Sequence, residues 1–253
     1  MMRKNVLRGL LVALFWLLLW YLLARLVGKE LLLPSPSAVC RRLLSLAGEA
    51  SFWRTCGVSL LRILSGVLTA VLAGTVLAVL TSRFSLLRAL FSPLLTVIKS
   101  TPVASFIILA LVWMGRSILP AFIASLIVLP VVWSNVSAGI AAADPQLLEV
   151  AALFRFSRGK TALRVYLPAA TPYFLSACRS SLGLGWKAGI AAEVLTMPAV
   201  SIGKMLYESK LYLETVDLFT WTVVVVLCSL LIEKLLLRLL SALETRLHKG
   251  VSA

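Results

Sequence analysis

Two charged residues interrupt an otherwise apolar stretch in the second half of the chain. Lys187 and Glu193 lie in the run at 171–195, and a charge at membrane depth is costly enough to indicate function or ionic pairing. Their spacing of six residues places them on different faces of one helix, so they are poor partners for each other. Both a role in a pathway and structural pairing remain open. The candidate partners are Asn135, Lys99, Arg62, a second subunit and the substrate.

Residue types that carry enzyme chemistry are scarce. The single histidine, His248, is in the tail, and the four cysteines have no metal-ligand spacing, so we expect neither a metal site nor a catalytic nucleophile. Gly159-Lys160-Thr161 matches the end of a phosphate-binding loop, but Phe154 stands where that motif requires a glycine. We therefore expect no catalysis, no cofactor and no ATP binding by this chain itself.

The composition predicts an all-α membrane protein. Hydrophobic residues make up 60% of the 253 residues, and about 20 apolar residues are needed for a helix to cross the bilayer. The net charge of +15 fits the excess of Lys and Arg in cytoplasmic loops, and without a basic groove motif nucleic acid is not an expected partner. We predict one transmembrane domain over residues 1–253, with about six spans at 6–27, 55–80, 86–114, 118–142, 171–195 and 218–240.

The distribution of charge also predicts a topology. Basic residues before the first span place the N-terminus in the cytoplasm, and six spans return the C-terminus to the same side. Residues 36–48 are expected to form a short amphipathic helix on the outer surface, with Ser35 as its N-cap. The loop at 196–216 would then face a partner outside the membrane.

Small residues are spaced for close helix packing in two of the spans. Gly66, Ala70 and Gly74 recur every four residues in the second span, and Gly185 and Gly189 form a GxxxG pair in the fifth. Small side chains allow helix backbones to approach closely in lipid. We expect both sets to lie at helix–helix contacts.

The third span contains two prolines that favour bends. Pro93 and the segment Lys99–Pro102 interrupt it, because proline lacks a backbone donor. Irregular backbone at membrane depth is tolerated where it lines a wet cavity or is buried, so Lys99–Pro102 is either a pathway element or an elbow at the interface. Asn135 could form a hydrogen bond either to a substrate or to a neighbouring helix, and both alternatives stay open. The candidate pathway residues are Lys99, Pro102, Trp133, Asn135, Trp186, Lys187 and Glu193.

Residues 143–168 are the longest polar-rich interruption of the apolar sequence. Asp144 can cap a helix, and Pro145 suits the first helical position. Four basic residues then place the segment in the cytoplasm by the positive-inside rule. We predict a short helix outside the membrane between two spans, with an ordinary basic loop as the alternative. The four basic residues are Arg155, Arg158, Lys160 and Arg164.

This segment resembles the cytoplasmic loop of type I binding-protein-dependent ABC importer permeases. The match consists of Glu149, Ala151 and Leu167-Pro168, and it implies a coupling helix that docks into a groove on an ATPase subunit. The family's usual glycine, six residues after the glutamate, is Arg155 here. Glycine permits a turn without steric cost, so either the turn is absent or Arg155 makes its own contact with the partner. The implied coupling residues are Glu149, Ala151, Ala152, Arg155, Arg158, Gly159, Lys160, Leu167 and Pro168.

Two other stretches resemble the nitrate, sulfonate and taurine branch of the same permeases. They are Leu33-Pro34-Ser35-Pro36 and the segment 185–193, which ends in Ala-Ala-Glu. The resemblance implies a permease in a bacterial inner membrane, with two copies of the chain forming the pathway. It further implies ATPase subunits that bind ATP and Mg²⁺, a substrate-binding protein outside, and a small anion or a vitamin precursor as substrate.

Two other functions remain open from the sequence. The first is an ion-coupled secondary transporter in which Glu193 and Lys187 titrate. The second is a membrane scaffold that docks an ATPase without transporting anything. A basic cytoplasmic segment with a helix-start signal favours the importer over the secondary transporter. Dependence of uptake on ATP hydrolysis would separate the importer from both alternatives.

Overall fold

The computed structural model describes the backbone of residues 2–251 and the side chains of residues 8 and 10–239. Every regular element in that part of the chain is a helix, as the composition predicts. In chain order the elements are α1 (Met2–Val27), α2 (Pro36–Ala47), α3 (Ala50–Arg83), α4 (Ser85–Ser100), α5 (Val103–Ala110), α6 (Leu119–Ala141), α7 (Pro145–Leu153), α8 (Arg158–Thr161), η1 (Ala162–Tyr166), α9 (Leu167–Thr196), α10 (Ile202–Leu211) and α11 (Thr215–Val251).

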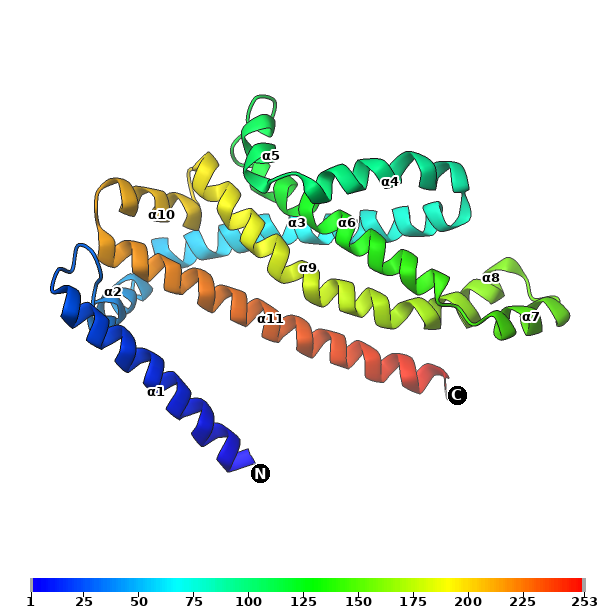
Figure 1. Cartoon of the computed structure of the whole chain (residues 1–253), viewed down its shortest axis with the longest axis horizontal. Coiled ribbons are helices and arrows are strands. Elements are labelled where there is room, and N and C mark those ends of the chain that lie inside the picture. The colour runs from blue at the N-terminus through cyan, green and yellow to red at the C-terminus, as the bar shows by residue number, and fades with distance from the viewer. Residues whose placement is uncertain (1, 252–253) are drawn as a thin grey trace.

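Helices α3, α6 and α9 form the centre of the bundle, and α11 runs along its side (Figure 1). The main apolar core combines Ile63 of α3, Val128 and Val132 of α6, Trp186 of α9 and Val224 of α11. All five side chains are buried. A second apolar cluster joins α5 to the first turns of α6 and to the end of α9.

The small residues lie at the central helix contacts, as predicted. A Cβ atom at Gly66 would overlap the backbone of Ala121, so α3 and α6 touch there without an intervening side chain. In the GxxxG pair, a Cβ at Gly189 would lie 2.7 Å from Cγ1 of Ile63, and Gly185 meets α3 in the same way. These contacts depend on glycine because the space belongs to the neighbouring helix.

Four helices are long and apolar enough to cross a membrane by themselves. They are α1 within Leu10–Val27, α3, α6, and α11 within Thr215–Leu239, and a fifth is added if the bent pair of α4 and α5 counts as one span. The remaining expected span, 171–195, lies within the 30-residue helix α9. Three charged residues, Arg179, Lys187 and Glu193, lower the hydropathy of that helix.

The third expected span is not one straight helix. α4 continues through Pro93, so the predicted break at that proline is wrong. Membrane helices tolerate proline where neighbouring groups satisfy the freed carbonyl. The predicted break at Lys99–Pro102 is confirmed: α4 and α5 meet there at an angle of 104°. Pro102 favours extended backbone at the preceding Thr101, whose ψ is 133°.

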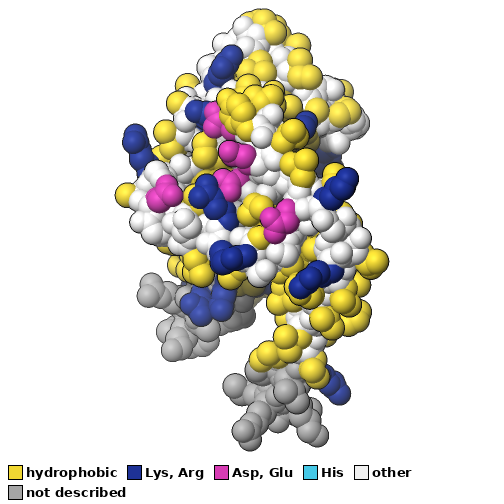
Figure 2. Space-filling view, turned by 90° about the vertical axis from the view of Figure 1, so that its left-hand side faces the viewer, with side chains coloured by type: hydrophobic (Ala, Val, Ile, Leu, Met, Phe, Trp, Pro, Cys, Tyr) yellow, Lys and Arg dark blue, Asp and Glu magenta, His cyan; other side chains and the backbone are white. Residues whose placement is uncertain are grey.

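The two ends of the bundle differ in structure and charge. α2 and α10 cover one end, where basic and acidic side chains are interspersed (Figure 2). The predicted amphipathic helix at 36–48 is α2, and Ser35 caps it by accepting a hydrogen bond from the Ala38 amide at 3.3 Å. The loop expected at 196–216 contains an additional helix, α10. At the opposite end α7 and α8 project beyond α6 and α9 (Figure 1).

Helix α1 is attached to the rest of the chain mainly near its C-terminal end. Trp20 Nε1 donates a hydrogen bond to the Pro34 carbonyl at 3.1 Å, and its ring stacks on Phe219 of α11. Beyond this end α1 diverges from the bundle (Figure 1). Its apolar side chains from Leu10 to Leu18 are exposed.

Candidate functional site

The projecting helix α7 begins as its sequence predicts. Asp144 Oδ1 accepts a hydrogen bond from the Gln146 amide at 2.8 Å, and Pro145 occupies the first helical turn. The cap satisfies an amide that has no partner within the helix, and the proline lacks an amide that would need one. A helix outside the apolar spans is therefore present, and whether the segment acts as more than an ordinary basic loop stays a prediction.

Arg155 forms the turn at the other end of α7. Its φ is 48°, in the left-handed region. The Arg155 amide donates to the Ala152 carbonyl at 3.0 Å, and the Phe156 amide donates to the Ala151 carbonyl at 2.8 Å. This pair of bonds is the Schellman arrangement, which usually has glycine at the left-handed position. The turn is thus formed despite the arginine, at a conformational cost of about 1 kcal/mol.

Helix α7 has two different faces. Ala151 is buried in a small apolar cluster with Ala143 and Val165, so it holds α7 against the base of α9. Its outer side is apolar as well as exposed, with Leu153 79% and Phe154 68% exposed. This exposed face was not predicted from the sequence, although its spacing is helical. Its members are Leu147, Val150, Leu153 and Phe154.

Exposed charged groups lie on α7 and on the adjacent α8. Glu149 is exposed on α7, and Arg158 and Lys160 are exposed on α8. Lys160 Nζ lies 4.0 Å from the centre of the Phe156 ring, a distance typical of a cation–π contact. Ala152, Arg155 and Gly159 are also exposed. An apolar centre with a charged rim is the usual composition of a protein–protein interface.

Leu167 and Pro168 do not separate the projecting segment from the next span. Helical structure continues from Arg158 through the π-helical turn η1 into α9. In that wide turn the Leu167 amide bonds to the Ala162 carbonyl, and Pro168 follows in the first turn of α9, where its missing amide costs little. Helix α9 therefore begins four residues before the expected start of the span at 171.

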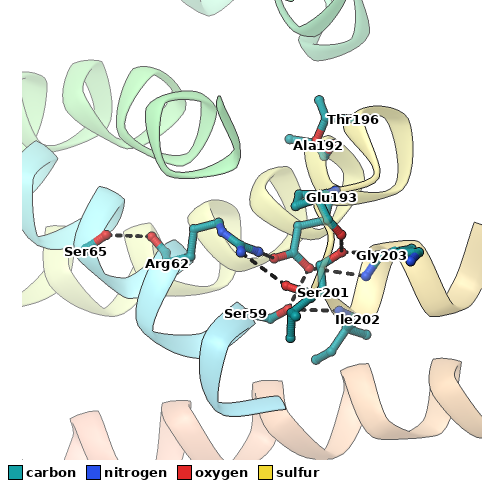
Figure 3. A network of polar contacts seen from close by, with 12 residues as sticks. Ser59, Arg62, Ser65, Ala192, Glu193, Thr196, Ser201, Ile202 and Gly203 are labelled. Carbon is teal, nitrogen blue, oxygen red and sulfur yellow. Dashed lines mark hydrogen bonds and ion pairs between the residues drawn. The ribbon is translucent and has the colours of Figure 1, made fainter. Parts of the chain in front are cut away.

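Glu193 is completely buried and fully hydrogen-bonded near the end of α9 (Figure 3). Arg62 of α3 donates to Glu193 Oε1 at 2.5 Å, and Ser59 Oγ and the Gly203 amide donate to Oε2 at 2.8 and 3.2 Å. Arg62 also donates to the Val200 carbonyl at 3.1 Å. Of the partners considered for this glutamate, the chain supplies Arg62.

This network fastens the start of α10 to α3 and α9. A Cβ at Gly203 would collide with Glu193, so α10 can start this close to α9 only at a glycine. Ser59 Oγ additionally accepts a hydrogen bond from the Ile202 amide at 2.9 Å. Structural pairing of Glu193 is therefore present in the fold, and its role in a pathway stays a prediction.

The other candidate pathway residues occupy separate places. Trp133 donates to Thr81 Oγ1 at 2.9 Å and joins α6 to α3, and buried Trp186 donates to the Val225 carbonyl at 3.2 Å and joins α9 to α11. Asn135 donates to the Val131 carbonyl of its own helix at 2.8 Å. Three more are exposed, and in the described part of the chain no hydrogen bond or ion pair joins two of the seven candidates. The exposed three are Lys99, Pro102 and Lys187.

Known proteins with similar sequences are transport permeases. The taurine transport system permease protein TauC of Escherichia coli is 28% identical over 227 residues, which cover 86% of this chain and 81% of the relative. The bicarbonate transport system permease protein CmpB of Synechococcus elongatus is 30% identical over 161 residues, or 62% and 57% of the two chains. The nitrate import permease protein NrtB of Leptolyngbya laminosa is 29% identical over 164 residues, or 64% and 57%.

The fold also has a solved counterpart. The crystal structure of a bacterial ABC transporter involved in the import of the acidic polysaccharide alginate superposes with a TM-score of 0.64. The match covers 95% of this chain and 96% of the other at 16% identity, so it supports the fold alone. The family described as the binding-protein-dependent transport system inner membrane component matches residues 66–249, which include α6, the projecting α7 and α9. This chain belongs to that family of inner membrane transport components.

Proposed function

We propose that this chain is the membrane-spanning subunit of an ATP-driven importer, that two copies form the pathway, and that α7 couples them to ATPase subunits. The observation that carries the coupling role is the exposed apolar face of α7 at the projecting end of the bundle. While Leu153 and Phe154 of α7 are exposed to water, the helix lacks the free energy that burial of these side chains would provide. Docking into an apolar groove of a partner restores it, which is the helix-in-groove mode of recognition.

The packing of α7 offers a route for the coupling. Its inner side rests on Val165 of η1 through Ala151, and η1 continues directly into α9. Closure of two ATPase subunits on ATP would move α7, and the short connection would carry that movement to α9. Alternating access then follows from α6 and α9 shifting in both copies, while the partner chains bind ATP with Mg²⁺ and hydrolyse the ATP.

The charges support an orientation for this subunit. Arg83, Arg88 and the basic residues of α8 gather at the end that carries α7, which the positive-inside rule assigns to the cytoplasm. Both termini would then be cytoplasmic. The opposite end, with α2 and α10, would face a substrate-binding protein. Its mixed surface charges suit a transient protein contact.

We propose a small anion as the substrate. The relatives named for taurine, bicarbonate and nitrate point in this direction. Lys187 is exposed on α9 in the single chain, so a second copy could place two such cations along one path. The residues proposed to contribute to that path are Lys99, Pro102, Trp133, Asn135, Trp186, Lys187 and Glu193.

Co-purification with charge-reversal variants tests this function. Glu149→Lys at the rim of the α7 face should abolish substrate-stimulated ATP hydrolysis and retention of the ATPase, while the chain still inserts into the membrane. Glu49→Lys makes the same change at an exposed position beside α2, at the opposite end, and should leave retention of the ATPase intact. Normal stimulated hydrolysis in Glu149→Lys would exclude the docking role. A wild-type chain that purifies alone and transports without ATP would instead support an ion-coupled transporter.

A further inference from the structure

A cavity of about 520 Å³ lies between the bundle and the base of α7. Its walls come from the end of α3, the first turns of α4, the last turns of α6, and from α7 and η1. This volume is within the range of about 300–1,000 Å³ typical of small-molecule sites. The cavity is therefore at the junction between the membrane bundle and the projecting segment.

Several hydroxyl groups lining the cavity have no hydrogen-bond partner among the described residues. Ser137 Oγ is buried and forms no hydrogen bond with any described residue. A buried polar atom without a partner is unusual, since its desolvation costs about 1–3 kcal/mol. Ser82 and Tyr166 also contribute hydroxyls for which the described residues provide no bond. By contrast, Ser134 Oγ already donates to the carbonyl of Val131.

The cavity carries one positive charge. Arg88, four residues into α4, is its only ionised lining residue among the described side chains, and no carboxylate lines it. The Arg88 guanidinium forms neither an ion pair nor a hydrogen bond with a described residue. An exposed guanidinium that lines the same cavity as these hydroxyls suits a tetrahedral oxyanion, since arginine binds phosphate oxygens with two parallel hydrogen bonds.

We propose that this cavity binds a phosphate group, either as free inorganic phosphate or as the headgroup of an anionic lipid. Arg88 supplies the charge, and the hydroxyls of Ser82, Ser137 and Tyr166 supply further donors. Because Leu148 of α7 also lines the cavity, a bound phosphate braces α7 against the α3–α4 hairpin. Its effect on coupling rests on the function proposed above, whereas the binding itself does not.

Thermal unfolding of the full-length chain in detergent tests the site. Inorganic phosphate, titrated at constant ionic strength with chloride, should raise the unfolding midpoint saturably. In Arg88→Gln the phosphate concentration for half the effect should rise about tenfold or more, because a charge-assisted bond is lost. Ser137→Ala should raise it by a smaller factor. Arg83→Gln removes the same charge at the same end but outside the cavity and should match the wild type.

Lipid nanodiscs distinguish the two sources of phosphate. If the ligand is a headgroup, discs with phosphatidylglycerol should raise the midpoint above that in phosphatidylcholine discs without added phosphate, and Arg88→Gln should abolish the difference. If the ligand is free phosphate, only added phosphate should act, in discs of either kind. Equal responses of Arg88→Gln and wild type in both arms would overturn the proposal. So would an Arg88-dependent response to taurine with none to phosphate, because the cavity would then bind a transported anion.

Discussion

Arg155 occupies a backbone conformation that usually belongs to glycine, with a φ of 48°. Two hydrogen bonds enforce it, because the amides of Arg155 and Phe156 close the end of α7. The arginine has therefore been accommodated without loss of the turn. Its side chain is exposed beside the apolar face of α7, and a contact of that side chain with a partner stays a prediction.

Substituting Arg155 separates the cost of the turn from the value of the side chain. Arg155→Gly should stabilise the chain relative to Arg155→Ala by about 1 kcal/mol, because glycine adopts a left-handed φ without strain. Both variants remove the guanidinium, so both should bind the ATPase as well as the wild type does if the arginine has no contact of its own. Thermal unfolding in detergent measures the first difference and co-purification measures the second. A glycine variant no more stable than the alanine variant would contradict the strain assigned to this turn.

Glu193 and Arg62 should be strongly coupled in stability. Glu193→Gln leaves Arg62 mostly buried, with a side chain 13% exposed, without its counter-charge. Breaking such a pair from one side costs about 3–5 kcal/mol, whereas replacing both partners is often tolerated. We expect Glu193→Gln to lower the unfolding midpoint sharply and the double variant Arg62→Met/Glu193→Gln to recover part of the loss. Additive effects in the double-mutant cycle would show that the pair is not energetically linked.

At the scale of the elements, the closest approach of α3 to α6 depends on the missing methyl group of Gly66. Gly66→Ala places a Cβ against the backbone of Ala121, so the helices must separate. Overpacking of this kind typically costs about 1–3 kcal/mol. Gly57→Ala is a matched control in the same helix, because a Cβ there meets nothing within 4 Å, and it should be neutral or slightly stabilising. Similar stabilities for the two variants would disprove the close contact.

Elements with local signals were the ones that the sequence predicted well. Ser35 before α2 and Asp144 before α7 are caps whose bonds join residues two or three apart. α10 was missed although Ser201 caps it in the same way, accepting from the Lys204 amide. The break predicted at Pro93 is absent because the effect of a proline depends on the groups that surround the helix.

Pairings between distant residues could not be predicted from the sequence, for a physical reason. The pair of Arg62 and Glu193 joins residues 131 positions apart, and the sequence offered Arg62 only as one of several partners. The exposed face of α7 and the cavity beside Arg88 are produced by packing between elements, which no local pattern encodes. The glycine contacts could be predicted in part. Their spacing predicted close helix packing, but only the structure shows which helix each glycine contacts.

At the scale of the whole molecule, the proposed orientation can be tested with a native cysteine. Cys40 on α2 is exposed, whereas the other three cysteines are buried or half-buried. A membrane-impermeant maleimide should label Cys40 in intact spheroplasts, and Cys40→Ser should remove the signal. In that background Ser157→Cys, at the projecting end, should react only after the membrane is permeabilised. Labelling of Ser157→Cys in intact spheroplasts would reverse the orientation.

The distance between Arg62 and Glu193 along the chain has a consequence for biosynthesis. At about 5–20 residues per second, the ribosome needs roughly 7–26 s after making Arg62 to add the 131 residues that reach its acid. During that interval the newly inserted α3 carries a lone cation, which can only reach toward the membrane surface. The bundle therefore cannot be completed helix by helix from the N-terminus. A nascent chain that stops before α9 retains an unpaired charge in the bilayer, a feature by which membrane proteases could distinguish it from the finished protein.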